Sequence, residues 1–349
     1  MILEPILNFF RGKAVTIPPL DGAFRPNTRL DEAEVFTTLA DADNLAVRNR
    51  TLFASSGNAV YEIAAGQAPR VAETFAAPVT ALAVAPAGEF AVGLETGSLV
   101  IGGKNVELSP AVRCITALAL GADGALWLAN GSAAQSPSMW SADLMAYGET
   151  GSVWKRDAGG AAFREIASGL AYPYGLHPTG DGVIVSESWR HRLIRIDAAG
   201  KRDIVVDHLP GYPARLAPAG DGGVWLSIFA PRNRLIEFIL QEEDYRSDMM
   251  AEVEPRYWIA PALSSSRSFL EPLQCGGIKT MGVHKPWSPS RSYGLVVKLD
   301  TRLRPVKSLH SRANGVRHGT CSTVELGGHV YIASRGGDAV LKIDLAEVS

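Results

Sequence analysis

One pattern, a small-residue turn followed by a short apolar strand, is repeated in ADGALWLAN (122–130), GDGVIVSES (180–188), GDGGVWLSI (220–228) and LGGHVYIAS (326–334). Weaker copies are VRNRTLFAS (47–55) and PAGEFAVGL (86–94). Gly and Asp supply the backbone angles that tight turns require, and alternation of apolar residues is typical of a strand with one buried face. The chain therefore repeats one turn-and-strand unit six times.

Further strands flank each copy. A short apolar segment precedes it, as in TALAV (80–84) and ITALAL (115–120), and an alternating segment follows it, as in HRLIRIDAAG (191–200) and DAVLKIDL (338–345). A fourth strand often comes next, as in RDIVVDHL (202–209). Four antiparallel strands in each of six units predict an all-β fold, a six-bladed β-propeller. A β-sandwich is the alternative, but it does not need six copies of one unit.

Two units carry long insertions after their second strand, residues 129–150 and residues 230–292. The second contains RLIEFILQEEDYRSDMMAEVEPRYW (234–258), the clearest helical tract of the chain. In a propeller these connections share a rim with the start of the first strands, so both insertions should rise on the top face. We expect the insertion in blade five to form a helical lid over a small-molecule pocket. Residues 21–349 would then form a single propeller domain.

The composition excludes several classes of function. The chain has 349 residues, 34 Lys and Arg against 36 Asp and Glu, and a formal net charge of −2, so no basic surface for nucleic acid is indicated. With 46% hydrophobic and 20% charged residues it is not a disordered chain. Its three cysteines are far apart, which gives neither a disulfide framework nor a zinc-binding CxxC pair.

The first residues, MILEPILNFFRGK, are apolar but lack the basic start and the cleavage site of a signal peptide. We expect residues 1–20 to form an N-terminal arm, either packed on the domain or lying on a membrane surface. No apolar run is long enough to form a transmembrane segment. The expected localisation is cytoplasmic, and the sequence indicates no oligomeric state.

Several segments together resemble a known family: SGLAYPYGLHPTGDGVIVSESWRHRLIRI (168–196), LPGYPARLAPAGDGGVWLSI (209–228), VELGGHVYIAS (324–334) and the opening PPLDGAFRPNTRLDEAEVF (18–36). They are similar to the strictosidine synthase-like proteins, within the senescence marker protein, gluconolactonase and paraoxonase superfamily of six-bladed propellers. The resemblance extends over nearly the whole chain from Pro18 onward.

The resemblance implies a divalent cation of the calcium type at the top of the channel, held by oxygen atoms from several first strands. In the family this ion polarises an ester or lactone carbonyl and activates water. Only Asp43 keeps a carboxylate at the four ligand positions, where Thr116, Tyr174 and Ala214 replace the others. We therefore expect an altered or lost metal site, with Asp43 as the remaining candidate ligand. The catalytic Glu of the plant strictosidine synthases is replaced by Cys321.

Three functions remain open. The resemblance favours a small-molecule hydrolase of the lactonase or esterase type. The second is a synthase or lyase that forms C–C or C–N bonds, like strictosidine synthase. The third is a propeller that binds a small molecule without catalysis. In each case the expected partner is a small molecule, which would bear a carboxylate if an arginine of the pocket binds it.

The starts of the first strands should converge on one pocket. We predict four catalytic residues, Asp43, His318, Tyr174 and Arg215, of which Asp43 or His318 would orient water and Arg215 or Tyr174 would stabilise an oxyanion. Each has a structural alternative. Arg215 would instead form a salt bridge with Asp43, His318 would bond a backbone carbonyl, and Tyr174 would fill the space of a missing metal.

Five further residues are predicted to contact substrate: Thr80, Thr116, Glu187, Trp189 and Cys321. Cys321 is either a nucleophile or a buried structural thiol. Glu187 ends a strand at the rim and is either an acid–base group or a partner in a salt bridge. Trp189 lies near the rim, as do Trp140, Trp258 and Trp287, and such rings either stack on a ligand or anchor the loops.

Overall fold

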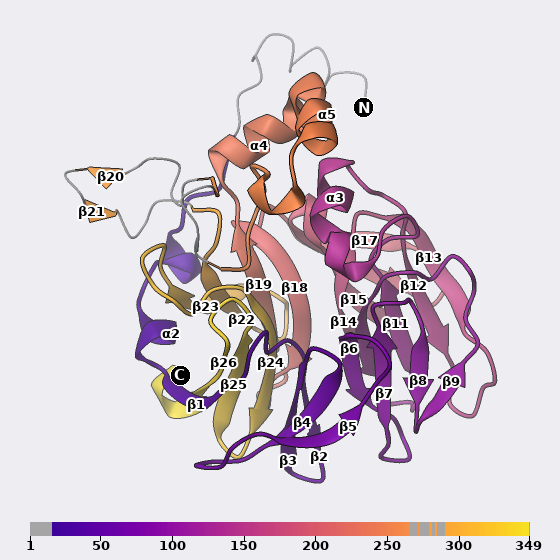
Figure 1. Ribbon diagram of the computed structural model, residues 1–349. Helices are drawn as coiled ribbons and strands as arrows, with labels where there is room; N and C mark the ends of the chain where they lie inside the picture. Colours follow the sequence, from indigo (N-terminus) through magenta and orange to yellow (C-terminus); the bar gives the residue numbers. More distant parts are fainter. Residues whose placement is uncertain (1–15, 265–270, 273–278, 281–282, 285–289, 349) are drawn as a thin grey trace.

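Six antiparallel sheets of four strands each surround a central axis, so the predicted six-bladed β-propeller is confirmed (Figure 1). The computed structural model describes residues 16–264, 271–272, 279–280, 283–284 and 290–348. The first strands contact one another in the order β2, β6, β10, β14, β18, β24 and back to β2, which closes the ring. Residues 1–15 of the expected N-terminal arm and Trp287 lie outside the described residues.

Each blade runs from the axis outward. Blades one to three consist of β2 (Leu45–Arg48), β3 (Thr51–Ser56), β4 (Ala59–Ile63), β5 (Arg70–Thr74); β6 (Val79–Val84), β7 (Phe90–Leu94), β8 (Leu99–Ile101), β9 (Lys104–Val106); and β10 (Ile115–Leu120), β11 (Leu126–Asn130), β12 (Gly151–Arg156), β13 (Arg164–Leu170). Blades four to six consist of β14 (Pro173–Thr179), β15 (Gly182–Glu187), β16 (Arg192–Asp197), β17 (Arg202–Val206); β18 (Gly211–Pro218), β19 (Val224–Pro231), β22 (Gly294–Leu299), β23 (Pro305–Ser311); and β24 (Thr320–Leu326), β25 (His329–Ser334), β26 (Ala339–Asp344), β1 (Glu34–Thr38).

Blade six takes its outer strand from the other end of the chain. Strand β1 pairs antiparallel with β26, with Glu34 opposite Lys342 and Thr38 opposite Ala339. The pairing ties a strand from the start of the chain to the last blade with backbone hydrogen bonds, so β26 is not the edge strand of its sheet.

Apolar side chains fill the junctions between neighbouring blades. Between blades two and three, for example, Leu99 packs with Ile115 and Leu128. Equivalent clusters occupy the remaining junctions, including the one between blades six and one, where Tyr331 and Val340 meet Leu52. Burial in a propeller therefore depends on both faces of each sheet, and this explains why many strands are apolar throughout.

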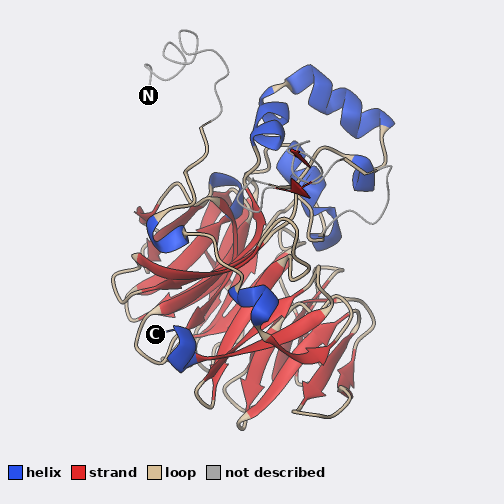
Figure 2. Cartoon of the chain, turned by 90° about the vertical axis from the view of Figure 1, so that its left-hand side faces the viewer, coloured by secondary structure: helices blue, strands red, loops and turns tan. Residues whose placement is uncertain are grey.

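Both insertions lie on one face of the ring (Figure 2). The blade-three insertion contains η2 (Pro137–Met139) and α3 (Trp140–Met145), and the blade-five insertion contains α4 (Arg234–Gln241), α5 (Glu243–Glu252), η4 (Pro255–Tyr257) and the hairpin β20 (Lys279–Thr280) and β21 (Val283–His284). The remaining helices are η1 (Gly22–Phe24), α2 (Arg29–Glu32), η3 (Ser188–Arg190) and α6 (Leu345–Val348). None of the described helices is both long enough and apolar enough to cross a membrane.

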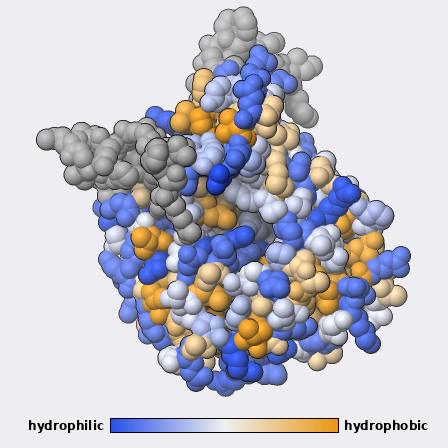
Figure 3. Space-filling model, viewed as in Figure 1, coloured by the Kyte–Doolittle hydropathy of each residue, from blue (hydrophilic) through white to orange (hydrophobic). Residues whose placement is uncertain are grey.

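The two insertions pack on each other. Leu144 and Met145 of α3 share an apolar cluster with Ile236 and Ile239 of α4 and with Phe229 of β19. The helical tract is divided into two helices at Glu242, and the blade-three insertion holds a helix that the sequence did not predict. On the outer side of α4, Leu235 and Phe238 remain exposed, and Figure 3 shows apolar surface on this insertion.

Candidate functional site

A cavity of about 430 Å³ opens between the first strands and the two insertions. Five predicted residues line it: Asp43, Thr80, Thr116, Tyr174 and Arg215. The first strands of blades one to five each contribute one of them or, for Asp43, the segment just before the strand. The expectation that these side chains, distant in sequence, meet around one axis agrees with this geometry.

A register break in the first strand directs these side chains. In blades two, three, four and six the pairing skips one residue, at Thr80, Thr116, Tyr174 and Cys321 respectively. In blade five it skips Ala214 and Arg215. A β-bulge of this kind turns a side chain away from the regular alternation, and bulges are common beside functional sites.

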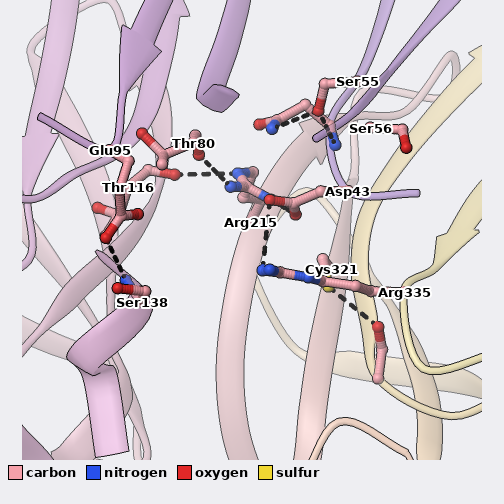
Figure 4. A network of polar contacts seen from close by, with 12 residues as sticks. Asp43, Ser55, Ser56, Thr80, Glu95, Thr116, Ser138, Arg215, Cys321 and Arg335 are labelled. Carbon is pink, nitrogen blue, oxygen red and sulfur yellow. Dashed lines mark hydrogen bonds and ion pairs between the residues drawn. The ribbon is translucent and has the colours of Figure 1, made fainter. Parts of the chain in front are cut away.

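The guanidinium group of Arg215 joins four blades. From blade five it donates to Asp43 Oδ1 in blade one over 2.6 Å, to the Thr80 carbonyl in blade two over 2.6 Å, and to the Thr116 carbonyl in blade three over 3.0 Å (Figure 4). Only 11% of its side chain is exposed. Three of its five N–H groups are thus used within the protein. The sequence left open whether Arg215 binds a ligand or forms a salt bridge with Asp43, and the structure shows the salt bridge.

Gly175 allows the backbone of β14 to lie close to β18 at Ala214 and Arg215. A Cβ atom at Gly175 would lie 2.3 Å from the Ala214 carbonyl oxygen and 2.7 Å from the Cα of Arg215. Both distances are far below a normal contact, so a larger residue would push β18 away from β14. The Tyr174-Gly175 pair therefore places a bulky phenol in the cavity and a close backbone contact directly beside it.

A second arginine approaches the other oxygen of Asp43. Arg335 follows the second strand of blade six, lines the cavity, and has its Nη1 3.7 Å from Asp43 Oδ2. This distance is longer than a hydrogen bond. One carboxylate thus faces two guanidinium groups, and Arg215 holds it more closely than Arg335 does.

The residues at this place do not fit as ligands of the divalent cation that the sequence resemblance implies. A calcium-type ion needs six to eight oxygen ligands, among them carboxylates. At the corresponding place Asp43 is engaged by Arg215, and the Thr80 and Thr116 carbonyls accept hydrogen bonds from the same guanidinium group. Among the described residues no three or more His, Cys, Asp or Glu side chains group together as metal ligands would. The positive charge at the axis is that of Arg215.

Aromatic side chains line the cavity beside the charged ones. Trp140, Tyr172, Tyr174 and Phe229 line it, and the Tyr174 ring lies beneath the Arg215 guanidinium carbon at 5.1 Å, within the range of a cation–π interaction. Burial raises the pKa of the Tyr174 hydroxyl well above its usual value, so the phenol stays protonated and can donate a hydrogen bond.

His318 does not line the cavity. Its side chain is fully buried, Nδ1 lies 2.8 Å from the Ser292 hydroxyl, and Nε2 lies 2.8 Å from the Arg312 carbonyl oxygen. Burial lowers its pKa below the usual value. Both ring nitrogens have hydrogen-bond partners, and one of these is a backbone carbonyl, as in the structural alternative for His318. A role for His318 as a base in the cavity has no geometric support.

Cys321 has the environment of a structural thiol. It is fully buried, and its thiol donates to the Gly319 carbonyl over 3.0 Å. Burial, followed by the charge of Asp43, raises its pKa to about 12. Since the thiolate is the reactive form, this thiol is inert at neutral pH.

Glu187 and Trp189 hold the rim together. Glu187 is fully buried, accepts the Ala171 N–H over 2.9 Å, and pairs with Arg192 at 2.6 Å. Trp189 stacks on Tyr172 at 4.3 Å and donates to Asp143 of α3 over 2.8 Å. Neither lines the cavity, whereas Trp140 of α3 does.

Two charged residues of the cavity were not predicted. Glu95 directly follows β7 and Arg335 directly follows β25, so each occupies the position just after the second strand of its blade. The Glu95 Oε1 atom accepts the Ser138 N–H over 3.0 Å, which is the hydrogen bond its carboxylate makes with the described residues. The signal was present in the repeat, because second strands end at the same rim at which first strands begin.

The helical insertion is fastened to the ring by Glu237 of α4. Its carboxylate accepts hydrogen bonds from Arg232 over 2.9 Å and from the Tyr212 hydroxyl over 3.1 Å. Burial alone would raise its pKa, but the hydrogen bonds and charges of His191 and Arg232 outweigh burial and lower the pKa to about 2.

Replacing Glu237 by Gln tests this anchor. A carboxylate with a lowered pKa stabilises the fold above its ordinary pKa near 4.5, and this contribution is lost as the pH falls towards 2. At neutral pH we expect Glu237→Gln to cost about 1.5–3 kcal/mol in free energy of unfolding. The difference from the wild type should shrink between pH 4.5 and pH 2 in urea unfolding. A difference that is constant with pH would contradict the anchor.

No family model matches the chain. Among curated proteins, the adipocyte plasma membrane-associated protein of Danio rerio is 24% identical over 189 residues, which is 51% of this chain and 39% of that protein. The Homo sapiens protein of the same name is 25% identical over 118 residues, 29% of this chain and 28% of that protein. The match thus spans at most 39% of the length of these two relatives.

Solved structures share the fold at low identity. A gluconolactonase from Xanthomonas campestris has a TM-score of 0.54 and 13% identity over 91% of both chains. A calcium-binding protein, regucalcin, from Agrobacterium tumefaciens has a TM-score of 0.55 and 12% identity over 89% of this chain and 92% of that one. The likeness shows that this chain has the six-bladed propeller fold of these proteins.

Proposed function

We propose that this chain is a small-molecule hydrolase of the lactonase or esterase type that works without a divalent cation. The observation that carries the proposal is the position of the Arg215 guanidinium group, at the meeting point of four blades and in the wall of a 430 Å³ cavity. The fold it shares with a gluconolactonase supports this reaction class.

The cavity offers groups for both halves of an ester hydrolysis. A carbonyl oxygen that gains negative charge can be stabilised by the guanidinium group of Arg215 and by the protonated Tyr174 hydroxyl. Water attacks the carbonyl carbon and transfers its proton to a carboxylate. The carbon–oxygen bond to the leaving group then breaks, and that oxygen takes up the proton.

Glu95 is the better proton acceptor of the two carboxylates in the cavity. Asp43 Oδ1 accepts a hydrogen bond from Arg215, and Arg335 approaches Oδ2, so both oxygens of Asp43 already face guanidinium groups. Glu95 accepts a single backbone N–H from the described residues. Asp43 therefore orients Arg215. Glu95 takes the role of orienting water, which the sequence analysis assigned to Asp43 or His318.

Metal independence is the direct test of this function. A panel of neutral esters and lactones should be hydrolysed equally well with and without a chelator, and calcium, manganese or zinc should leave the melting temperature unchanged. Any ion bound to the folded state would raise that temperature by mass action. Hydrolysis that disappears with chelator and returns with one of these ions would contradict the proposal.

A non-catalytic binding propeller is the second candidate, favoured by the paired state of Asp43 and the position of His318 outside the cavity. It predicts binding of panel members without any turnover. The synthase reading has no such support, because the residue at the position of the plant catalytic Glu is the buried thiol of Cys321.

A further inference from the structure

The charge of Arg335 is less satisfied than that of Arg215. Its nearest described carboxylate oxygen is Asp43 Oδ2 at 3.7 Å, and its Nε has no hydrogen-bond partner among the described residues. The side chain is 36% exposed, compared with 11% for Arg215. An arginine with few partners in a cavity wall keeps N–H groups available for a ligand.

The local charge balance favours an anion. At this end of the cavity two guanidinium groups face the single carboxylate of Asp43, and the shorter bond of that carboxylate goes to Arg215. Asp41 also attracts Arg335, but it is exposed to water, which weakens such an attraction. Glu95 lies apart from Arg335, beside Thr80, Thr116 and Ser138 (Figure 4).

Thr80 adds a neutral polar group. Its hydroxyl oxygen is buried and has no hydrogen-bond partner among the described residues, although the Thr80 side chain lines the cavity. A buried polar atom without a partner costs free energy, so a ligand gains from this hydroxyl only if the Thr80 side chain rotates towards the cavity.

Aromatic and aliphatic side chains also line the cavity. The rings of Trp140, Tyr172, Tyr174 and Phe229 line the cavity together with Ile115. These side chains provide a surface on which an aromatic or aliphatic body can pack.

We propose that Arg335 is the anion-binding side chain of the cavity and that the ligand is a small carboxylate with an aromatic or apolar body. This assignment rests on the proposed function only because both concern the same cavity. It names the class of molecule that the cavity selects. Arg335 is the specificity-determining residue, whereas Arg215 is held in place by the protein. Arg335 thereby takes over the carboxylate-binding role that the sequence offered to Arg215.

Binding of matched pairs tests the assignment. Calorimetry would compare benzoate, phenylacetate, 3-phenylpropionate and hexanoate with their primary amides, which have nearly the same shape and no charge. We expect the wild type to prefer at least one carboxylate over its amide by about tenfold to a hundredfold, the range of one charge-assisted hydrogen bond. Arg335→Met should remove that preference, and Arg335→Lys should keep part of it. The exposed Arg164 on the outer strand β13 gives the control, Arg164→Met, which should behave as wild type.

Several results would overturn the assignment. One is a wild type that binds no carboxylate more tightly than its amide, and another is an Arg335→Met variant that keeps the preference. If neither Arg335 variant folds, a crystal structure with the tightest carboxylate decides, because that group must lie within hydrogen-bond distance of Arg335. A carboxylate bound at another side chain would contradict the assignment. Hydrolysis of neutral esters is measured separately, so loss of the preference and loss of the proposed function are distinguishable.

Discussion

Replacing Asp43 by Asn is expected to lower the free energy of unfolding by about 3–5 kcal/mol, the usual cost of removing one partner of a buried ion pair. Asp43 and Arg215 expose only 9% and 11% of their side chains, so water cannot replace the lost carboxylate charge. Arg335 would lose its nearest described carboxylate at the same time. Urea unfolding followed by circular dichroism measures the change.

The exposed pair of Glu62 and Arg70 provides the matched control. Their side chains are 31% and 72% exposed, so Glu62→Gln should cost less than about 1 kcal/mol. The double variant Asp43→Asn with Arg215→Met should lose less than the sum of the two single changes, because the pair is then removed as a unit. If Asp43→Asn costs no more than Glu62→Gln, the pair does not hold the ring as described.

Replacing Glu95 by Gln is expected to reduce kcat for ester or lactone hydrolysis by about 10²–10⁴-fold, which is the typical contribution of a general base. The amide oxygen of Gln can still accept the Ser138 N–H, so the change removes the proton acceptor while keeping the contact. The free energy of unfolding should therefore stay close to that of the wild type. Activity and stability would separate at Glu95, whereas at Asp43 both would fall.

Glu107 is the control for Glu95. It is exposed and follows β9 in the same blade, away from the cavity lining, so Glu107→Gln should leave kcat unchanged. Glu95→Gln with full activity would show that another group takes the proton from water, with Asp43 the remaining carboxylate of the cavity lining.

The fold was predictable because each blade is specified by a short local sequence pattern. Each blade repeats a Gly- or Asp-containing turn and a short apolar strand, as in residues 180–188 and 220–228, and the number of repeats gives the number of blades. The pairing of β1 with β26 was not predictable in this way. Strand β1 is mostly exposed and carries no repeat signature, and its partner lies at the far end of the chain.

The site was predictable where it follows the repeat. Thr80, Thr116 and Tyr174 occupy equivalent positions and Arg215 occupies the next one, and the bulges in their strands direct them into one cavity. The choice between the two roles of Arg215 required distances, because the same guanidinium group could bind a ligand or Asp43.

Residues outside that repeat position were harder to place. His318 precedes β24 by two residues, and its contacts with Ser292 and Arg312 come from loops whose approach no local pattern reveals. Glu95 and Arg335 follow second strands, and their place at the cavity becomes evident once both ends of each hairpin are considered.

The most direct test of the account is a crystal structure determined after soaking in calcium or in manganese, whose anomalous scattering would reveal a bound ion. The account predicts that no ion binds at the channel axis and that the Arg215 guanidinium group lies there, 2.6 Å from Asp43 Oδ1 and within hydrogen-bond distance of the Thr80 and Thr116 carbonyls. An ion coordinated by Asp43, with Arg215 turned away from the axis, would contradict it.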